Sequence, residues 1–549
     1  MNYTQHVQHE FESKPGQEFR PDGRFDAHFD SIALLLVTAA FLVRLGTAQG
    51  TFLNPDEALH YLLANQSTWR LAYKASLTNA HPPLLTSVLY FWRRVGTSEF
   101  VLRLPSVIAG TAFCWIFFKW LTRISGKATG FIGLILVSFL PPLIALSAEV
   151  RQYALLLFFL AATAYLLERA LAENSAGMML LSAITLYLAL LTHYSAILFA
   201  VAVGVYSLLR IGSRPFDQVT TAWIMGQAGI VGLIAALYLS HISQLKGDYA
   251  AGTIQGWLAN SFFRPGHENP FLFAVARTGG VFQYVFGQLA VGDFACLAFI
   301  GGIVLLWRKK EPASGPDATS HQLVILLVLP FVVGAGAAIA RIYPYGGTRH
   351  SAFLIMFGVA GVSLAMAWAV KENIRRGIAL AVLVVALAVL VVALCNAFGM
   401  PHRPYILRED QSRIQINRAA EFIRSQIPPS DLIFVDYQTR LLLGYYVCPE
   451  QPVPFTAAVG SLEHFACGDH RVAAAGPDLY IFTADNFLPR WNQLARTLNA
   501  GQKVWVVQAG WDVNLPNELQ RRLPEFQVAG SHWFGKNIAL LPLTIEKPR

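Results

Sequence analysis

A short stretch near the start of the chain carries the side chains best suited to acid–base chemistry. Within NPDEALHY (Asn54–Tyr61), Asp56 and His60 are four residues apart and would share one face of a helix, whereas Glu57 would lie about 100° away around the axis. A carboxylate in this position can act as a general base, and carboxylate and imidazole groups together can ligate a divalent metal ion. Asp56 and Glu57 are therefore the candidate catalytic residues, and the candidate ligands of an optional metal are Asp56, Glu57 and His60.

A structural role for the same segment is the alternative. Pro55 suits the first turn of a helix, where the helix dipole favours carboxylates, so the two acids could simply begin a helix. Further along, the prolines of His81–Pro83 fix a rigid extended segment, since each proline locks its own φ and disfavours the helical region for the residue before it. His81 is thereby held just before a short apolar stretch, as either a ligand-contacting or a structural histidine.

Two further loops place arginine and tyrosine beside long apolar segments, in SAEVRQYAL (Ser147–Leu155) and YPYGGTRHS (Tyr343–Ser351). Arginine can hold a phosphate through bidentate bonds, and the Gly-Gly pair of the second loop would let backbone amides approach such a group closely. The alternative is that Arg151 and Arg349 pair with Glu149 or Asp56. The candidate substrate-binding residues are His60, His81, Glu149, Arg151, Tyr153, Tyr345, Arg349 and His350.

The composition indicates a membrane protein with many spans. Hydrophobic residues make up 54% of the 549 residues, charged residues only 14%, and the mean hydropathy is +0.45. A soluble domain carries about a quarter charged residues. Five cysteines in a chain of this length exclude a disulfide scaffold, and the net charge of +9 is typical of basic cytoplasmic loops rather than of nucleic-acid binding.

Uncharged runs of about 20 residues predict about eleven transmembrane helices, because only a helix satisfies its own backbone hydrogen bonds in lipid. Residues 80–93 are too short to cross and are expected to form a helix at the membrane interface. The predicted spans are Ser31–Val43 extended through Arg44, Leu104–Leu121, Ala128–Ala148, Tyr153–Leu167, Ala176–Thr192, Tyr194–Leu209, Val219–Leu245, Thr278–Trp307, Gln322–Ala340, Ser351–Val370 and Gly377–Pro401.

Basic residues beside the span ends favour a cytoplasmic N-terminus, and an odd number of spans then places the C-terminal part outside. The expected domains are a cytoplasmic tail at 1–30, a membrane domain at 31–400 with a large first outer loop at about 45–103, and an extracytoplasmic soluble domain at 401–549.

The last 148 residues, by contrast, alternate short apolar runs with polar helical patterns, which is typical of a small α/β domain. Cys448 and Cys467 could form a disulfide outside the membrane or remain two buried thiols. The expected elements are helices at Ile414–Ile427 and Trp491–Leu498 and strands at Leu432–Val435, Asp478–Phe482 and Lys503–Gln508.

The loop motifs follow one another in a distinctive order. DE in the first outer loop is followed by HPPL, by RLPS (Arg103–Ser106), by the E-x-R-x-Y loop and by a late G-T-R-H element. From about Ser31 to Met400, this order resembles the polytopic GT-C glycosyltransferases. More narrowly, it is similar to family 39, the bacterial relatives of the protein O-mannosyltransferases, to the lipid A aminoarabinose transferase and to the galacturonosyl transferases of the RgtA/B/C/D type.

The resemblance implies a polyprenyl-phosphate sugar donor, inverting transfer to a hydroxyl, and a catalytic carboxylate in the first outer loop, which by motif position is Asp56 with Glu57 beside it. The expected protein is a hexosyl- or pentosyltransferase of the cell envelope in the bacterial cytoplasmic membrane. Its site would face outward, and its acceptor would be a lipid, glycan or protein. We expect no cofactor beyond the optional metal, and no nucleic-acid partner.

Two other functions remain open at the level of sequence. A lipid-linked glycan flippase or transporter is one, although the spans show neither the inverted repeats nor the charged or broken midplane helices typical of transporters. An O-antigen ligase or polymerase of similar topology is the other, and its essential groups would lie in a late outer loop.

Overall fold

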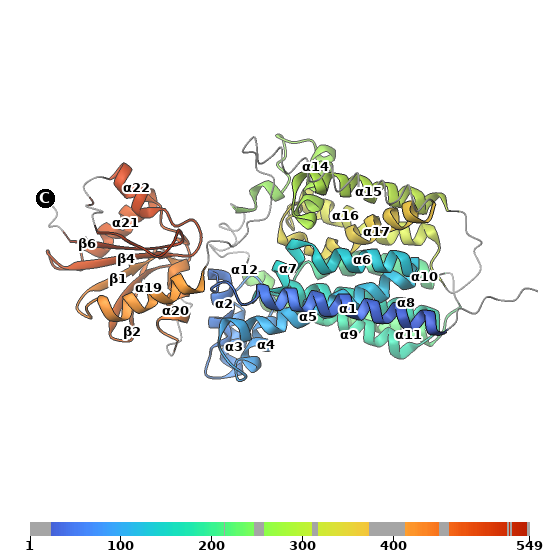
Figure 1. Cartoon of the computed structure of the whole chain (residues 1–549), viewed down its shortest axis with the longest axis horizontal. Coiled ribbons are helices and arrows are strands. Elements are labelled where there is room, and N and C mark those ends of the chain that lie inside the picture. The colour runs from blue at the N-terminus through green and yellow to red at the C-terminus, as the bar shows by residue number, and fades with distance from the viewer. Residues whose placement is uncertain are drawn as a thin grey trace, which may run out of the picture.

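The computed structural model describes residues 23–212, 215–245, 257–309, 317–372, 412–449, 460–523 and 530–545, together with Phe526. Figure 1 shows a bundle of long helices at one end and a sheet domain at the other. The short helices α2, α3 and α4 lie where the two parts meet. The expected architecture of a polytopic helical protein with a small C-terminal α/β domain is therefore confirmed.

Within the described ranges, seven helical stretches are long and apolar enough to cross a membrane, or eight if one bent pair counts as a single span. The expected total of eleven stays a prediction, because Gly377–Pro401 lies outside the described residues. Two further apolar helices, α9 (Ala176–Leu190) and α10 (Ala196–Ile211), are shorter. The long stretches are Asp30–Thr47 in α1 (Gly23–Thr47), α5 (Glu99–Ser125), α8 (Tyr153–Glu173), Gln218–Leu245 comprising α11 (Gln218–Leu237), η1 (Tyr238–Ile242) and α12 (Ser243–Leu245), α15 (Leu289–Arg308), α16 (Ser320–Ile339), and Arg349–Val370 across η3 (Arg349–Leu354) and α17 (Ile355–Glu372).

Two predicted spans are not single straight helices. The prediction of one span at Thr278–Trp307 is wrong, because α14 (Pro270–Phe286) ends at Gly287, which has a φ of +73°, and α15 then packs back against α14. A Cβ on Gly292 would lie 2.2 Å from the Cα of Gln283, so glycine allows the two helices to touch. The run at Ala128–Ala148 bends by 63° between α6 (Lys127–Phe139) and α7 (Pro141–Ser147), where Pro141 begins the second helix.

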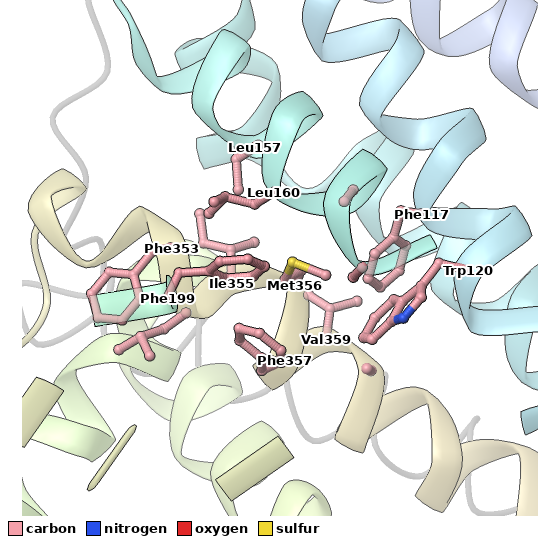
Figure 2. Packing of buried hydrophobic residues seen from close by; sticks show 14 of the residues in the cluster. Phe117, Trp120, Leu157, Leu160, Phe199, Phe353, Ile355, Met356, Phe357 and Val359 are labelled. Carbon is pink, nitrogen blue, oxygen red and sulfur yellow. The ribbon is translucent and has the colours of Figure 1, made fainter. Parts of the chain in front are cut away.

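An aromatic and aliphatic core ties the late helices to the early ones. In Figure 2, side chains of α17 pack between those of α5, α8 and α10. The Phe357 ring lies 6.3 Å from that of Trp120 and 5.8 Å from that of Phe199, measured between centroids. Because η3 runs directly into α17, this core also fixes the position of Arg349. The buried residues labelled in the figure are Phe117, Trp120, Leu157, Leu160, Phe199, Phe353, Ile355, Met356, Phe357 and Val359.

The first loop forms three short helices, α2 (Pro55–Ala64), α3 (Trp69–Ser76) and α4 (Leu84–Trp92). The start of α2 is a capping box in which the Asn54 side chain accepts from the Glu57 amide and the Glu57 side chain accepts from the Asn54 amide. Pro55 occupies the first turn, where its missing N–H costs nothing. The helix expected within residues 80–93 is present as α4.

The C-terminal domain is a six-stranded mixed sheet with the order β2-β3-β1-β4-β6-β5. The central strand β1 (Leu432–Val435) is parallel to β3 (His470–Ala475) and β4 (Lys503–Ala509), and the other pairings are antiparallel. The edge strands are β2 (Leu462–Cys467) and β5 (His532–Trp533), and β6 (Ile538–Thr544) lies between β4 and β5.

Helices cover both faces of this sheet. Ile433 and Val435 share a core with α19 (Arg413–Gln426), α20 (Tyr437–Tyr446) and residues of the first loop, whereas Leu432 and Phe434 face α21 (Ala484–Ala495) and α22 (Leu515–Arg522). The first loop and the C-terminal domain are thus joined by one hydrophobic core.

The expected helix and strands at Ile414–Ile427, Leu432–Val435 and Lys503–Gln508 are confirmed to within a residue or two. The helix expected at Trp491–Leu498 is present but begins at Ala484, since Thr483 and Asn486 form a capping box there. The expected strand at Asp478–Phe482 is wrong. That segment is a loop because its backbone groups bond to the start of α20, where Tyr437 and Gln438 donate to the carbonyls of Leu479 and Tyr480. Cys448 and Cys467 are joined by a disulfide.

Candidate active site

Asp56 lies at the first turn of α2 and is held by two arginines from distant loops. Its Oδ2 is 2.8 Å from Nη1 of Arg151 and accepts a hydrogen bond of 2.6 Å from Nη2 of Arg349. The Asp56 side chain is 16% exposed. Three loops that were singled out separately in the sequence therefore meet at one carboxylate, and the pairing of both arginines with Asp56 that was held open as an alternative is present.

The neighbouring arginines determine the protonation state of Asp56. Burial alone would raise the pKa of Asp56, but the adjacent Arg151 and Arg349 guanidinium groups outweigh it and lower the pKa to about 2. Asp56 is therefore ionised at neutral pH. With both arginines bound to it, it is also a weak base, so a group that competes for the arginines would make Asp56 more basic.

Glu57 points the other way and has a structural partner. Its carboxylate accepts hydrogen bonds from Nε and Nη2 of Arg103 at 2.8 and 2.9 Å and from the Val150 amide at 2.8 Å. The Glu57 and Arg103 side chains are both fully buried. Arg103 also donates to three carbonyls of the 48–52 segment, those of Ala48, Thr51 and Phe52. This ion pair fixes α2 against α5 and the loop that carries Arg151.

A histidine row extends from α2 into the bundle. The ring centroids of His60 and His81 are 6.0 Å apart, those of His81 and His193 are 5.3 Å apart, and those of His193 and His350 are 6.4 Å apart. Burial lowers the pKa of His60 to about 3 and that of His81 well below its ordinary value, and the Arg151 charge acts in the same direction. These two histidines are therefore neutral at pH 7 and can exchange hydrogen bonds with a ligand without neutralising an anion.

The loop of Glu149, Arg151 and Tyr153 brings further polar groups to this region. Glu149 is buried there. The Arg349 guanidinium lies 5.9 Å from the centroid of the Tyr153 ring. Tyr345, in contrast, lies against α14, since its hydroxyl is 2.5 Å from the Thr278 hydroxyl.

The expected metal ligands are not grouped as a metal site. Within the ranges that the structure describes, no cluster of three or more His, Cys, Asp or Glu side chains could hold a metal ion. The Glu57 carboxylate is turned toward Arg103, and Oδ2 of Asp56 is turned toward two arginines. Asp56, Glu57 and His60 therefore do not converge on one point.

Three residues of this region were missed in the sequence. Gln152 is fully buried, and neither polar atom of its side chain has a hydrogen-bond partner in the described structure; its position inside the E-x-R-x-Y loop could have revealed it. His193 follows α9 without any motif. Tyr480 belongs to the C-terminal domain, yet its hydroxyl lies 3.4 Å from Oδ1 of Asp56. No local signal connects Tyr480 to the first loop, because only the tertiary fold brings the two together.

Comparisons with known proteins give a family match over part of the chain and solved structures of similar fold. Residues 80–240 match the dolichyl-phosphate-mannose-protein mannosyltransferase family. No curated protein matches the chain. The structure of ArnT from Cupriavidus metallidurans in the apo state aligns with a TM-score of 0.51 and 12% identity, over 95% of this chain and 99% of that one. ArnT from the same organism bound to undecaprenyl phosphate gives a TM-score of 0.52 at 11% identity, over 96% and 100%.

These likenesses show a GT-C fold of the ArnT type along nearly the whole chain. Together with the family match, they support a multi-span membrane glycosyltransferase of the GT-C superfamily, in agreement with the order of the loop motifs.

The buried ion pair of Glu57 predicts that this acid, unlike Asp56, is needed for stability. Glu57→Gln leaves the fully buried Arg103 without its counter-ion, which costs about 3–5 kcal/mol when one partner of a buried pair is removed. We expect this variant to unfold several degrees below the wild type, as followed by tryptophan fluorescence of the purified protein during heating. Glu421→Gln, on the exposed side of α19, is the matched control and should leave the midpoint unchanged. An E57Q protein as stable as the wild type would refute the structural role of the ion pair.

Proposed function

We propose that this protein transfers one sugar from a polyprenyl phosphate to an acceptor hydroxyl, with inversion at the anomeric carbon, on the outer face of the cytoplasmic membrane. The observation that carries the proposal is the meeting of Asp56 with Arg151 and Arg349 at the edge of the helical bundle. The fold shared with an ArnT bound to undecaprenyl phosphate supports a polyprenyl-phosphate donor.

The chemistry needs a base for the acceptor and a cation for the leaving group. Asp56 takes the proton from the acceptor hydroxyl while that oxygen forms its bond to the anomeric carbon. The bond between this carbon and the phosphate oxygen breaks on the opposite side, and its electron pair leaves with the phosphate. Arg151 and Arg349 neutralise that phosphate, which guanidinium groups do well because they offer paired N–H donors.

The two roles are connected through the arginines. When the donor phosphate binds Arg151 and Arg349, it competes with Asp56 for the same guanidinium groups. The Asp56 carboxylate then loses part of the charge stabilisation that holds its pKa near 2, and its basicity rises where the acceptor must be deprotonated. His60, Gln152 and Tyr153 are buried close by with unpartnered polar side-chain atoms among the described residues, and we assign them to the hydroxyl groups of the donor sugar.

The role of Asp56 as base predicts a large loss of rate without a loss of fold. Asp56→Asn is nearly isosteric but cannot accept the proton, so turnover should fall at least about a hundredfold while the donor still binds. Transfer of a radiolabelled sugar from polyprenyl phosphate, measured with equal amounts of folded protein, tests this. Asp485→Asn makes the same chemical change at an exposed ion pair with Arg522 and should keep full activity. Near-normal turnover of D56N would refute the base assignment.

The phosphate role of the arginines predicts a change in donor binding. Arg349→Ala should weaken the apparent donor affinity, and Arg349→Lys should restore it only partly, because an ammonium group lacks the planar fork. Arg264→Ala, which removes an arginine paired with Glu268 in a different loop, is the control. If both Arg349 variants kept the wild-type donor KM, the contact with Asp56 would be a structural ion pair only.

The proposed orientation of the protein in the membrane depends on a contact between the first loop and the C-terminal domain. The first loop and the C-terminal domain contact one another through Asp56 and Tyr480, so both must lie on the same side of the membrane. A phosphatase that is active only in the periplasm should therefore be active when fused after Arg549 and inactive when it replaces the chain after Arg308. A stable but inactive fusion at Arg549 would overturn the outward orientation.

A further inference from the structure

An aromatic patch borders the catalytic carboxylate. It consists of Tyr437, Tyr480 and Trp511 of the C-terminal domain and of Trp257 from the segment that precedes α14. The Tyr480 ring centroid lies 5.1 Å from that of Trp257, 5.9 Å from that of Tyr437 and 6.1 Å from that of Trp511, with the rings of Tyr480 and Trp511 stacked. The patch adjoins Asp56 through the Tyr480 hydroxyl, 3.4 Å from Oδ1.

The patch is not part of the domain core. Trp257 is 61% exposed, and the three other rings are partly exposed. The same domain has a separate aromatic cluster around Phe434, Phe487 and Trp491, which is buried in the sheet-helix core. The hydrophobic core of the domain is therefore complete without the patch. Its partly exposed aromatic rings beside Asp56 are available to contact a ligand.

The start of α20 holds the patch in a fixed arrangement. Asp436 caps α20 by accepting from the Thr439 amide and also accepts from the Phe482 amide, which anchors the loop of Tyr480. Gln438 clamps Trp511, since its Nε2 donates to the Trp511 carbonyl at 2.8 Å and its Oε1 accepts from the Trp511 amide at 3.1 Å.

The first residues of α20 therefore orient the rings of Tyr480 and Trp511 before any ligand binds. Gly510 has a φ of +119°, and a Cβ there would lie 2.8 Å from Cγ of Pro55, so the segment of Trp511 lies directly against the turn that carries Asp56. This rigidity reduces the conformational entropy that these side chains would otherwise lose when a ligand binds.

We propose that the aromatic patch binds a pyranose ring of the acceptor, which makes the acceptor a carbohydrate-bearing molecule. This inference rests on the proposed function and names its acceptor class. The C–H face of a pyranose is apolar and slightly positive, and it complements the negative face of an aromatic ring. The hydroxyl groups at the ring edge remain free, so a sugar lying on the exposed side of this patch would direct one hydroxyl toward Asp56.

Sugar binding can be measured without any transfer reaction. The full-length protein in nanodiscs is titrated with methyl pyranosides of glucose, galactose, mannose and N-acetylglucosamine, and binding is followed by saturation-transfer-difference NMR. We expect at least one pyranoside to bind, and Trp511→Ala to weaken it about threefold to tenfold. Trp257→Ala should weaken it too. Trp533→Ala, on the edge strand β5 of the same domain, is the matched control and should bind as the wild type does. Free polyprenyl phosphate should not displace the pyranoside.

Trp257→Ala also keeps the test decisive if Trp511→Ala fails to fold, because Trp257 is largely exposed and belongs to a different segment. Absence of pyranoside binding to the wild type, or equal binding by the wild type and W257A, would overturn the proposal. Because the assay needs no donor, this failure is distinct from a failure of the transferase assignment, which would appear as an absence of transfer from polyprenyl phosphate.

Transfer kinetics distinguish the acceptor sugar from the donor sugar. With a glycolipid fraction of bacterial envelopes as acceptor, W257A and W511A should raise the acceptor KM while the donor KM stays unchanged. A rise confined to the donor KM would overturn the acceptor assignment. Label recovered in protein alone, with none in sugar-bearing lipid or glycan, would equally overturn it.

Discussion

The buried ion pair between Glu57 and Arg103 is the constraint on which the rest of the site depends. Two fully buried charges are stable only as partners with their remaining hydrogen bonds satisfied, and here Asn54, Val150 and three loop carbonyls satisfy them. The pair therefore fixes the start of α2, the end of the 48–52 segment and the 149–153 loop relative to α5. Because Glu57 is turned inward, its neighbour Asp56 is turned toward the arginines.

This arrangement explains how two adjacent acids can differ in role. On a helix they point in directions about 100° apart, so one can face the core while the other faces a ligand. The inward acid is fully paired, whereas Asp56 is partly exposed and paired with the two arginines to which we assign the donor phosphate. The sequence already indicated this division of faces. It did not indicate Arg103 as the partner, because RLPS carried no chemical signal beyond its place in the motif order.

Much of the site could be predicted because its chemistry lies in loops between apolar helices. Asp56, His60, Arg151 and Arg349 stood out as polar residues where lipid-spanning runs end, and the structure brings them together. The rest depended on tertiary structure. The apolar run at residues 278–307 conceals a turn at Gly287, since hydropathy does not register a reversal of direction. The segment Asp478–Phe482 has the composition of a strand, but its backbone is bonded to the start of α20 and it presents Tyr480 to another domain.

The hydrogen bond between Tyr480 and Asp56 joins residues 424 positions apart in the chain. Contacts of such long range close only after nearly all of the polypeptide has been synthesised, and they carry a large loop-closure entropy. The site is therefore among the last parts of the molecule to assemble. A chain that stops before its C-terminal domain is made contains Asp56, Arg151 and Arg349 but lacks Tyr480, which borders the carboxylate. Under the proposed function, transfer would need the completed chain, so an unfinished molecule would leave the lipid donor unused without any separate inhibitor.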